Sequence, residues 1–281
     1  MEAHLEEIRE RQKEIWNRFS PGWDKWDDFM MQFLQPMSEV IISKLTIEEN
    51  DHVLDVACGT GEPGLTIALL AKKGKVVGTD LSDKMLEIAD KHALQKGIVN
   101  YVTSVCDVCE LPYADYSFDK ISCRMGFMFF PDMQLAMDEM YRVLKPDGKM
   151  ATCVWGEPKN NLWVSGIMGI INKNMSIEQP PVEAPGMFRC GSKGLMESVM
   201  EKSGFKNIAE QEVSGKVVYD DFEHLWQMMN DVAAPIVGAL SRASDELKQQ
   251  IKNEVEAFAK PFQTSKGLEM VYSSLVFNGS K

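Results

Sequence analysis

Long apolar runs are missing from this chain of 281 residues. No stretch approaches the ~18 apolar residues that a membrane-spanning helix needs. The opening segment, MEAHLEEIRERQKEIW, is charged and lacks the apolar core of a signal peptide. These absences predict a cytoplasmic protein, and the 44% hydrophobic content suits one large domain or one domain with a cap.

An excess of positive charge is also missing. The chain has 30 Lys and Arg residues against 42 Asp and Glu residues, which gives a net charge of −12. A partner with a phosphate backbone needs a basic stripe, and nothing in the sequence builds one. The composition therefore predicts no nucleic-acid partner. The net charge of the whole chain does not exclude a local basic patch.

The sequence also lacks the two C-x-x-C pairs that a typical zinc site needs. The six cysteines are mostly placed in or beside apolar segments, where Cys behaves as a small buried hydrophobe. Cys106 and Cys109 form a lone C-x-x-C, with no second pair at the spacing of a zinc site. We therefore expect no metal site.

The stretch VLDVACGTGEPG, residues 53–64, is the most informative part of the sequence. Its apolar start indicates a buried strand, and a helical pattern begins directly after Gly59, Gly61 and Gly64. Glycines allow a sharp turn and close approach to a ligand, while a helix N-terminus offers free N–H groups to an anion. The next apolar strand ends at Asp80, a carboxylate that is well placed to accept hydrogen bonds from ribose hydroxyls.

Asp55 lies inside the first of these strands, before the glycines. A site for a pyrophosphate gains nothing from a buried carboxylate at this position. A cofactor with an amino-acid tail and a cationic sulfonium would tolerate or use the charge. A purely structural role, in which Asp55 accepts hydrogen bonds from loop N–H groups, is an equally good interpretation, and one residue can fill both roles.

Short apolar segments alternate with helical patterns from His52 to Trp155. Segments that are apolar on both faces are typical of a parallel sheet covered by helices. The pattern predicts a doubly wound α/β fold, and ligands in such folds bind outside the carboxyl ends of the strands. The expected strands are near 52–57, 75–80, 100–106, 118–123 and 149–155, with helices over 62–72, 82–96 and 132–145.

The segments LDVACGTGEPG, VVGTDLSDKML, FDKISCRMGFMFFPD and MYRVLKPDGKM, with Asp107 before the third, resemble class I S-adenosylmethionine-dependent methyltransferases. The likeness is greatest to the ubiquinone/menaquinone-biosynthesis group (methyltransferase type 11 domain). It covers about Trp16 to Trp155 and is loose beyond. It implies a Rossmann-like seven-stranded sheet with an antiparallel last strand, S-adenosyl-L-methionine as cofactor, and O-, N- or C-methylation of a small molecule.

The resemblance also implies a set of cofactor-binding residues. These are Asp55, Ala57, Gly59, Thr60 and Gly61 around the methionine tail, Asp80 at the ribose, Leu81 and Met85 near the adenine, Asp107 at its amino group with Val108 supplying a backbone N–H, and Cys123, Arg124 and Met125 beside the sulfonium. Arg124 departs from the apolar residue expected there. Its partner could be a carboxylate of the fold or the carboxylate of the cofactor.

The remaining segments are expected to surround this site. Residues 1–46 are predicted to form an N-terminal helical lid on a methyltransferase domain of residues 47–281, with helical cap insertions near 157–190 and 221–262. The first helix is expected over residues 2–18, followed by an aromatic segment that Pro21 and Gly22 break, with separate helices around Phe29 and from Pro36 to Leu45. Gln179 to Gly186 is expected to be a proline-rich loop.

No catalytic residue is assigned from the sequence. Of the histidines (His4, His52, His92 and His224), His224 is the one candidate for a general base, because it begins the second cap insertion. An acidic acceptor or an amine needs no dedicated base. The oligomeric state is not readable from the sequence.

The cap segments suggest a small apolar acceptor, although ordinary helix core would explain the same residues. They are Trp163, Met168, Met187, Phe188, Trp226, Met228 and Met229.

Two other functions stay open at this point. An NAD(P)-dependent oxidoreductase is favoured by the G-x-G-x-x-G spacing and by Asp80. That function leaves Asp55 and Asp107 unexplained. A cofactor-binding protein without catalysis would show the same motifs as the methyltransferase.

Overall fold

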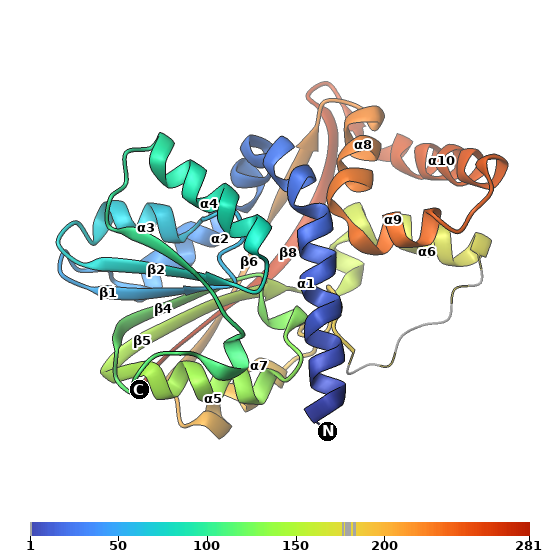
Figure 1. Cartoon of the computed structure of the whole chain (residues 1–281). Helices are drawn as coiled ribbons and strands as arrows, with labels where there is room; N and C mark the ends of the chain where they lie inside the picture. Colours follow the sequence, from blue (N-terminus) through green and yellow to red (C-terminus); the bar gives the residue numbers. More distant parts are fainter. Residues whose placement is uncertain (1, 176, 178–180, 182–183) are drawn as a thin grey trace.

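The computed structural model describes residues 2–175, 177, 181 and 184–281. Its centre is one mixed sheet in the order β3-β2-β1-β4-β5-β8-β6, with the short β7 pairing beside β8 (Figure 1). The first five strands are parallel, and β8 runs antiparallel to β5 and β6. The doubly wound sheet with an antiparallel last strand is therefore confirmed. The strands are β1 His52–Val56, β2 Lys75–Asp80, β3 Tyr101–Val105, β4 Phe118–Arg124, β5 Leu144–Trp155, β6 Lys206–Tyr219, β7 Gln263–Thr264 and β8 Gly267–Ser280.

The helices expected between the parallel strands are present, and their ends lie close to the predicted ones. Helices α8, α9 and α10 lie between β6 and β8 in the chain, as expected for an insertion. The helices are α1 Glu2–Lys25, α2 Asp27–Leu45, α3 Gly64–Leu70, α4 Asp83–Gln95, α5 Met133–Val143, α6 Leu162–Met175, α7 Leu195–Ser203, α8 Phe222–Val232, α9 Ala234–Leu240 and α10 Asp245–Ala259. Part of the expected proline-rich loop, residues 179–180 and 182–183, lies outside the described residues.

The predicted break at Pro21 is wrong, because α1 continues to Lys25. Proline lacks the N–H that would bond the carbonyl of residue 17. The Ser20 hydroxyl donates to that carbonyl instead, with 3.0 Å between Ser20 Oγ and Asn17 O. Pro36 likewise lies inside α2 rather than at the start of a third helix. The N-terminal region is thus two long helices that meet at Trp26.

These two helices occupy different places on the sheet. Helix α2 packs on β4, β5 and β8 through a buried apolar stripe that includes Phe33, Met37 and Ile41. Helix α1 runs in front of the sheet, between the part with α3 and α4 and the part with α6 and α8–α10 (Figure 1). It contacts α4 on one side and α8 on the other. A search of the described helices for a stretch that is long and apolar enough to cross a membrane finds none.

A tight contact between β2 and β3 yields a prediction about stability. A Cβ placed on Gly78 would lie 2.1 Å from the Tyr101 hydroxyl oxygen and 2.9 Å from Cys58 Sγ. Gly78→Ala should therefore lower the free energy of unfolding by about 1–3 kcal/mol, as overpacking of a core does. Urea unfolding should show a smaller loss when the substitution is made in a Tyr101→Phe background.

Gly169→Ala in α6 is the matched control, since nothing lies within 4 Å of a Cβ at that position. It should leave stability unchanged or raise it by up to about 1 kcal/mol. Equal losses for Gly78→Ala in both backgrounds would contradict the contact.

Candidate active site

The turn after β1 lies against the end of β4. Ala57, Gly59 and Gly61 have φ angles of 53°, 53° and 114°, in the left-handed region that favours glycine. A Cβ on Gly126, just past β4, would lie 2.8 Å from Ala57 Cβ. A Cβ on Gly59, by contrast, meets nothing within 4 Å. The turn is thus held against the protein on one side and has free space at Gly59.

Asp55 is fully buried and binds the turn to the sheet. Its Oδ2 accepts a hydrogen bond from the Gly64 N–H at 2.9 Å, and its Oδ1 accepts from the Ser122 hydroxyl at 2.6 Å. The structural role considered from the sequence is therefore present. Burial raises the pKa of Asp55 to about 7, although the bonds from Ser122 and Gly64 and the nearby Arg124 favour the charged form.

Asp80 links the ends of β1 and β2. Its Oδ2 accepts from the Gly59 N–H at 3.0 Å, and its Oδ1 accepts from the Ser82 N–H at 2.9 Å. Burial raises the pKa of Asp80, and these backbone N–H groups oppose the shift. Ser82 in turn caps α4 by accepting from the Met85 N–H. One carboxylate therefore sets the glycine turn and the start of the next helix in a fixed relation.

Asp107 lies at the end of β3 and caps the short helix of Val108–Glu110. Its Oδ1 accepts from the Cys109 N–H at 3.0 Å. Its Oδ2 forms an ion pair with Arg9 Nη2 of α1 at 2.7 Å. No pattern in the sequence indicates this partner, because Arg9 lies among many charged residues of a helix that is distant in the chain.

Arg124, at the end of β4, faces α2. Its Nη1 donates to Ser38 Oγ at 2.9 Å, and its Nη2 lies 3.6 Å from Met31 Sδ. Burial lowers the pKa of Arg124, and the charge of Asp55 opposes this. Among the described residues, no carboxylate lies within ion-pair distance of the guanidinium. Of the two partners considered from the sequence, a carboxylate of the fold is therefore not found there.

The other expected cofactor residues lie around these carboxylates. Leu81 follows Asp80 directly and is half-buried, whereas Met85, Val108 and Cys123 are buried. Met125 has a φ of 61° and donates its N–H to the Cys153 carbonyl. The Thr60 hydroxyl donates to Asp27 Oδ1 of α2 at 3.1 Å. The structure thus brings the predicted set together at one edge of the sheet.

Helix α1 covers this edge. Asn17 Nδ2 donates to Asp83 Oδ1 at 2.9 Å, and Asn17 Oδ1 accepts from the Ser82 hydroxyl at 2.5 Å. The Trp16 ring meets the Phe129 ring edge to face, with 5.1 Å between centroids, and lies 6.2 Å from the Trp23 ring. The sequence draws attention to the aromatic residues of this group, but no pattern in it indicates the hydrogen bonds of Asn17.

His224 lies in an aromatic cluster rather than beside Arg124. Its ring stacks on Trp26, with 5.0 Å between centroids, and touches the rings of Phe29 and Tyr219. Its Nδ1 accepts the Asp220 N–H at 3.3 Å. His92 is closer to the glycine turn, since its Nδ1 lies 3.0 Å from the Thr60 carbonyl oxygen.

The six cysteines are all free thiols. Burial raises the pKa of Cys106 to about 11 and that of Cys109 to about 12, so both stay protonated near neutral pH. Among the residues that the structure describes, no group of three or more His, Cys, Asp or Glu residues could hold a metal ion.

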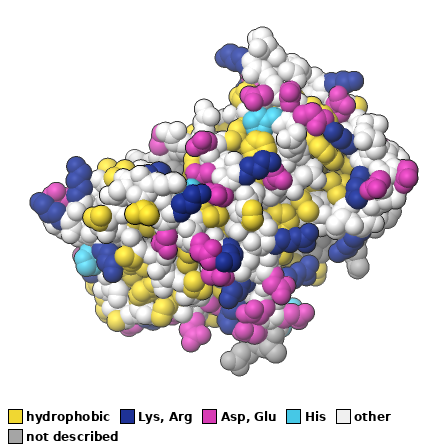
Figure 2. All heavy atoms as spheres, turned by 45° about the horizontal axis from the view of Figure 1, so that its top comes forward, with side chains coloured by type: hydrophobic (Ala, Val, Ile, Leu, Met, Phe, Trp, Pro, Cys, Tyr) yellow, Lys and Arg dark blue, Asp and Glu magenta, His cyan; other side chains and the backbone are white. Residues whose placement is uncertain are grey.

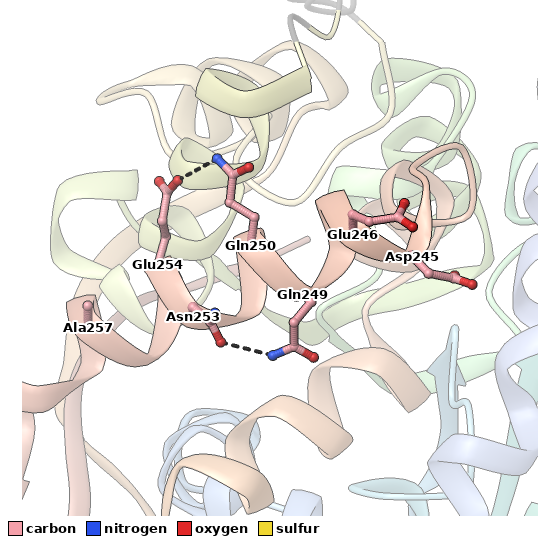
Figure 3. Close-up of a pocket in the computed structure, with 7 residues that line it drawn as sticks. All are labelled: Asp245, Glu246, Gln249, Gln250, Asn253, Glu254 and Ala257. Atoms are coloured by element: carbon pink, nitrogen blue, oxygen red, sulfur yellow. Dashed lines mark hydrogen bonds between the residues drawn. The ribbon is translucent and has the colours of Figure 1, made fainter.

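A separate surface hollow lies along α10, far from this chemistry. All seven side chains that line it come from α10, and two pairs of them, Gln250 with Glu254 and Gln249 with Asn253, bond each other (Figure 3). The hollow is the flank of one polar helix, and we assign it no ligand.

Comparisons with known proteins indicate the family to which the chain is similar. Residues 47–179 match a protein family described as a methyltransferase domain. The demethylmenaquinone methyltransferase of Lactobacillus johnsonii is 29% identical over 210 residues, which are 69% of this chain and 84% of that protein.

Two solved structures share the fold. A putative methyltransferase from Bacillus halodurans has a TM-score of 0.60 at 18% identity, covering 87% of this chain and 98% of that one. The phosphoethanolamine N-methyltransferase 2 of Haemonchus contortus, solved with phosphomonomethylethanolamine and S-adenosylhomocysteine, has a TM-score of 0.53 at 18% identity, covering 87% and 52%. At these identities the two structures show the fold alone.

The match of residues 47–179 to the methyltransferase-domain family, the relatives and the fold support a class I S-adenosylmethionine-dependent methyltransferase. It is an enzyme that transfers a methyl group from S-adenosylmethionine to a small-molecule acceptor. Within this class it resembles the demethylmenaquinone methyltransferases, as the sequence motifs indicated. The methyltransferase prediction is confirmed, and the oxidoreductase alternative is not favoured.

The raised pKa of Asp55 predicts how stability depends on pH. The folded state binds this proton more tightly than the unfolded chain does, so its contribution is complete below about pH 4 and is lost as pH rises through about 7. In Asp55→Asn the new amide would keep an acceptor for Gly64 and offer a donor to the Ser122 oxygen without titrating. Between pH 5 and 8 the wild-type chain should therefore lose roughly 1–4 kcal/mol more unfolding free energy than Asp55→Asn.

Urea unfolding at pH 5, 6, 7 and 8 measures this difference. Parallel profiles for the two proteins would show that Asp55 does not titrate in this range.

Proposed function

We propose that the cofactor binds at the strand ends with its parts distributed as the sequence resemblance implied. The glycine turn, with Asp55, Ala57, Gly59, Thr60 and Gly61, surrounds the methionine tail. Asp80 serves the ribose, Leu81, Met85, Asp107 and Val108 serve the adenine, and Cys123, Arg124 and Met125 lie beside the sulfonium. The free space at Gly59 supports close approach of a ligand to the turn.

Arg124 gives the clearest support for a cofactor with an amino-acid tail. A partly buried guanidinium is costly unless it is paired, and the half-buried Arg124 has a hydroxyl and a thioether as its described partners. The carboxylate of S-adenosylmethionine would supply the missing opposite charge in a bidentate contact. Of the two partners left open by the sequence, we therefore favour the cofactor carboxylate.

The bound cofactor supplies an electrophilic methyl group on a sulfonium sulfur. The residues of the chain have to hold this group, align the acceptor with it and exclude water. Asp55 and Asp80 help to hold the cofactor, because they accept hydrogen bonds from the N–H groups of the glycine turn and so fix its position. Helix α1 helps to exclude water, because it covers the strand ends. Only an acceptor that binds already ionised needs no residue to remove its proton.

We further propose that the acceptor is a flat, apolar aromatic molecule with a polar oxygen, such as a hydroquinone. The observation that carries this is the aromatic group of Trp16, Trp23 and Phe129 beside the end of β4. The Trp23 Nε1–H is buried and has no hydrogen-bond partner among the described residues, so it is a ready donor for an acceptor oxygen. The names of the relatives point to the same chemistry.

A panel of acceptors tests this proposal. With methyl-labelled S-adenosylmethionine, a reduced naphthoquinone that carries a short prenyl chain and lacks the ring methyl should be methylated. Phosphoethanolamine, which is small and charged, should not be, because an aromatic slot gives its phosphate no partner. Transfer to phosphoethanolamine alone would overturn the aromatic acceptor while leaving the methyltransferase itself intact.

We also propose roles for the segments outside the sheet and a cellular location for the enzyme. Residues 1–46 act as a lid on the domain of residues 47–281, and the segments near 157–190 and 221–262 act as caps. We propose that the enzyme works in the cytoplasm, where its free thiols stay reduced, and that it has no nucleic-acid partner. Among the described side chains on the face in Figure 2, acidic and basic groups lie interspersed.

The assignment of Asp80 predicts a loss of cofactor affinity. Asp80→Ala removes the acceptor for the ribose hydroxyls and also frees the Gly59 and Ser82 N–H groups. Affinity for S-adenosylhomocysteine, measured by calorimetry, should fall about tenfold to a hundredfold, since charge-assisted bonds are worth roughly 1.5–3 kcal/mol.

Asp90→Ala on α4 is the control, because the Asp90 carboxylate bonds only the exposed Thr103 hydroxyl among the contacts described. It should bind like the wild type. An unaltered dissociation constant in Asp80→Ala would refute the ribose assignment.

A further inference from the structure

The ion pair between Arg9 and Asp107 joins the lid directly to the proposed adenine subsite. Arg9 Nη2 lies 2.7 Å from Asp107 Oδ2, and the two side chains are only 27% and 12% exposed. Glu6, one turn earlier on α1, forms an ion pair with the other terminal nitrogen of the guanidinium, Arg9 Nη1. Asp107 Oδ1 is already used by the Cys109 N–H. With α1 in place, Oδ1 therefore accepts a hydrogen bond, whereas Oδ2 is held by the ion pair with Arg9 alone and accepts no hydrogen bond from the described residues.

In the proposed function, on which this inference rests, Asp107 accepts a hydrogen bond from the exocyclic amino group of adenine. That amino group and a guanidinium offer the carboxylate the same thing, an N–H donor in a plane. The guanidinium adds a full positive charge, which the amino group lacks. Arg9 is therefore a competitor for the oxygen that the adenine needs.

The other contacts of α1 hold the guanidinium in position. Asn17, about two turns further along the same helix, bonds Ser82 and Asp83 at the start of α4. Trp16 packs on Phe129 beyond β4. Helix α1 thus contacts residues that follow β2 and β4 as well as Asp107, which follows β3. Of these contacts, only the ion pair of Arg9 involves a side chain that is assigned to the adenine.

We propose that Arg9 is a gating residue that occupies the adenine subsite in the absence of cofactor. Cofactor binding displaces the guanidinium from Asp107 Oδ2, and the first turns of α1 move with it. The closed form is the stable one without ligand, so measured affinity is reduced by the fraction of chains that are closed.

Binding kinetics of Arg9→Met test the gate. Methionine keeps an unbranched apolar side chain in the helix and removes the charge and the donors. Stopped-flow binding of S-adenosylhomocysteine should show a faster association and a dissociation constant about two- to fivefold lower than in the wild type, the range expected for a pair of this exposure. In the wild type alone, rising salt should speed association, because salt weakens the pair.

Arg11→Met is the matched control, since it removes the same charge from an exposed position of the same helix. It should bind like the wild type. Thermal unfolding of both variants shows that each is folded, and amide exchange of residues 4–13 without ligand should be faster in Arg9→Met alone.

Three results would overturn the gate. Weaker binding in Arg9→Met would mean that Arg9 holds the adenine rather than competing with it, and unchanged binding would mean that the pair is only a surface contact. Equal gains in Arg9→Met and Arg11→Met would assign the effect to net charge. Wild-type chain that does not bind S-adenosylhomocysteine at all would instead refute the proposed function, and the gate with it.

Discussion

The site depends on one buried carboxylate, that of Asp55. It accepts from the first residue of α3 and from the hydroxyl of Ser122 on β4, so a single side chain joins β1, the glycine turn and the neighbouring strand. A Cβ on Gly64 would lie 2.6 Å from Asp55 Oδ2, which requires glycine at the point where the turn meets the strand. Because an unbonded buried carboxylate is costly, these contacts strongly constrain the turn.

Carboxylates that accept hydrogen bonds from backbone N–H groups also lie at two other strand ends of this edge of the sheet. Asp80 ends β2 and Asp107 follows the end of β3, and each accepts a hydrogen bond from a backbone N–H of the residues that follow. The carboxylates are thereby oriented before any ligand arrives, which reduces the ordering that binding would otherwise require. The drawback is that an unused oxygen attracts other donors of the chain, and at Asp107 that donor is Arg9.

The sheet could be predicted from the sequence because its signals are local, and the same local signals placed the expected cofactor residues at the strand ends. Apolar strands, glycines at a turn and acids at strand ends lie within a few residues of one another, as around Asp55. The break at Pro21 was wrong because a neighbouring hydroxyl, Ser20, replaces the lost hydrogen bond. The contacts of Arg9 and Arg124 could not be predicted, since they join segments that are far apart in the chain.

The geometry of α2 bears on the missing general base. One residue turns a helix by about 100°, so Asp27, Met31 and Ser38 share one stripe, and these are the residues that contact Thr60 and Arg124. Phe29 points to the opposite side, where it touches His224. A helix about 10 Å thick therefore separates the imidazole from the guanidinium. Proton removal by His224 would require α2 to move, whereas an acceptor that is already ionised requires nothing of it.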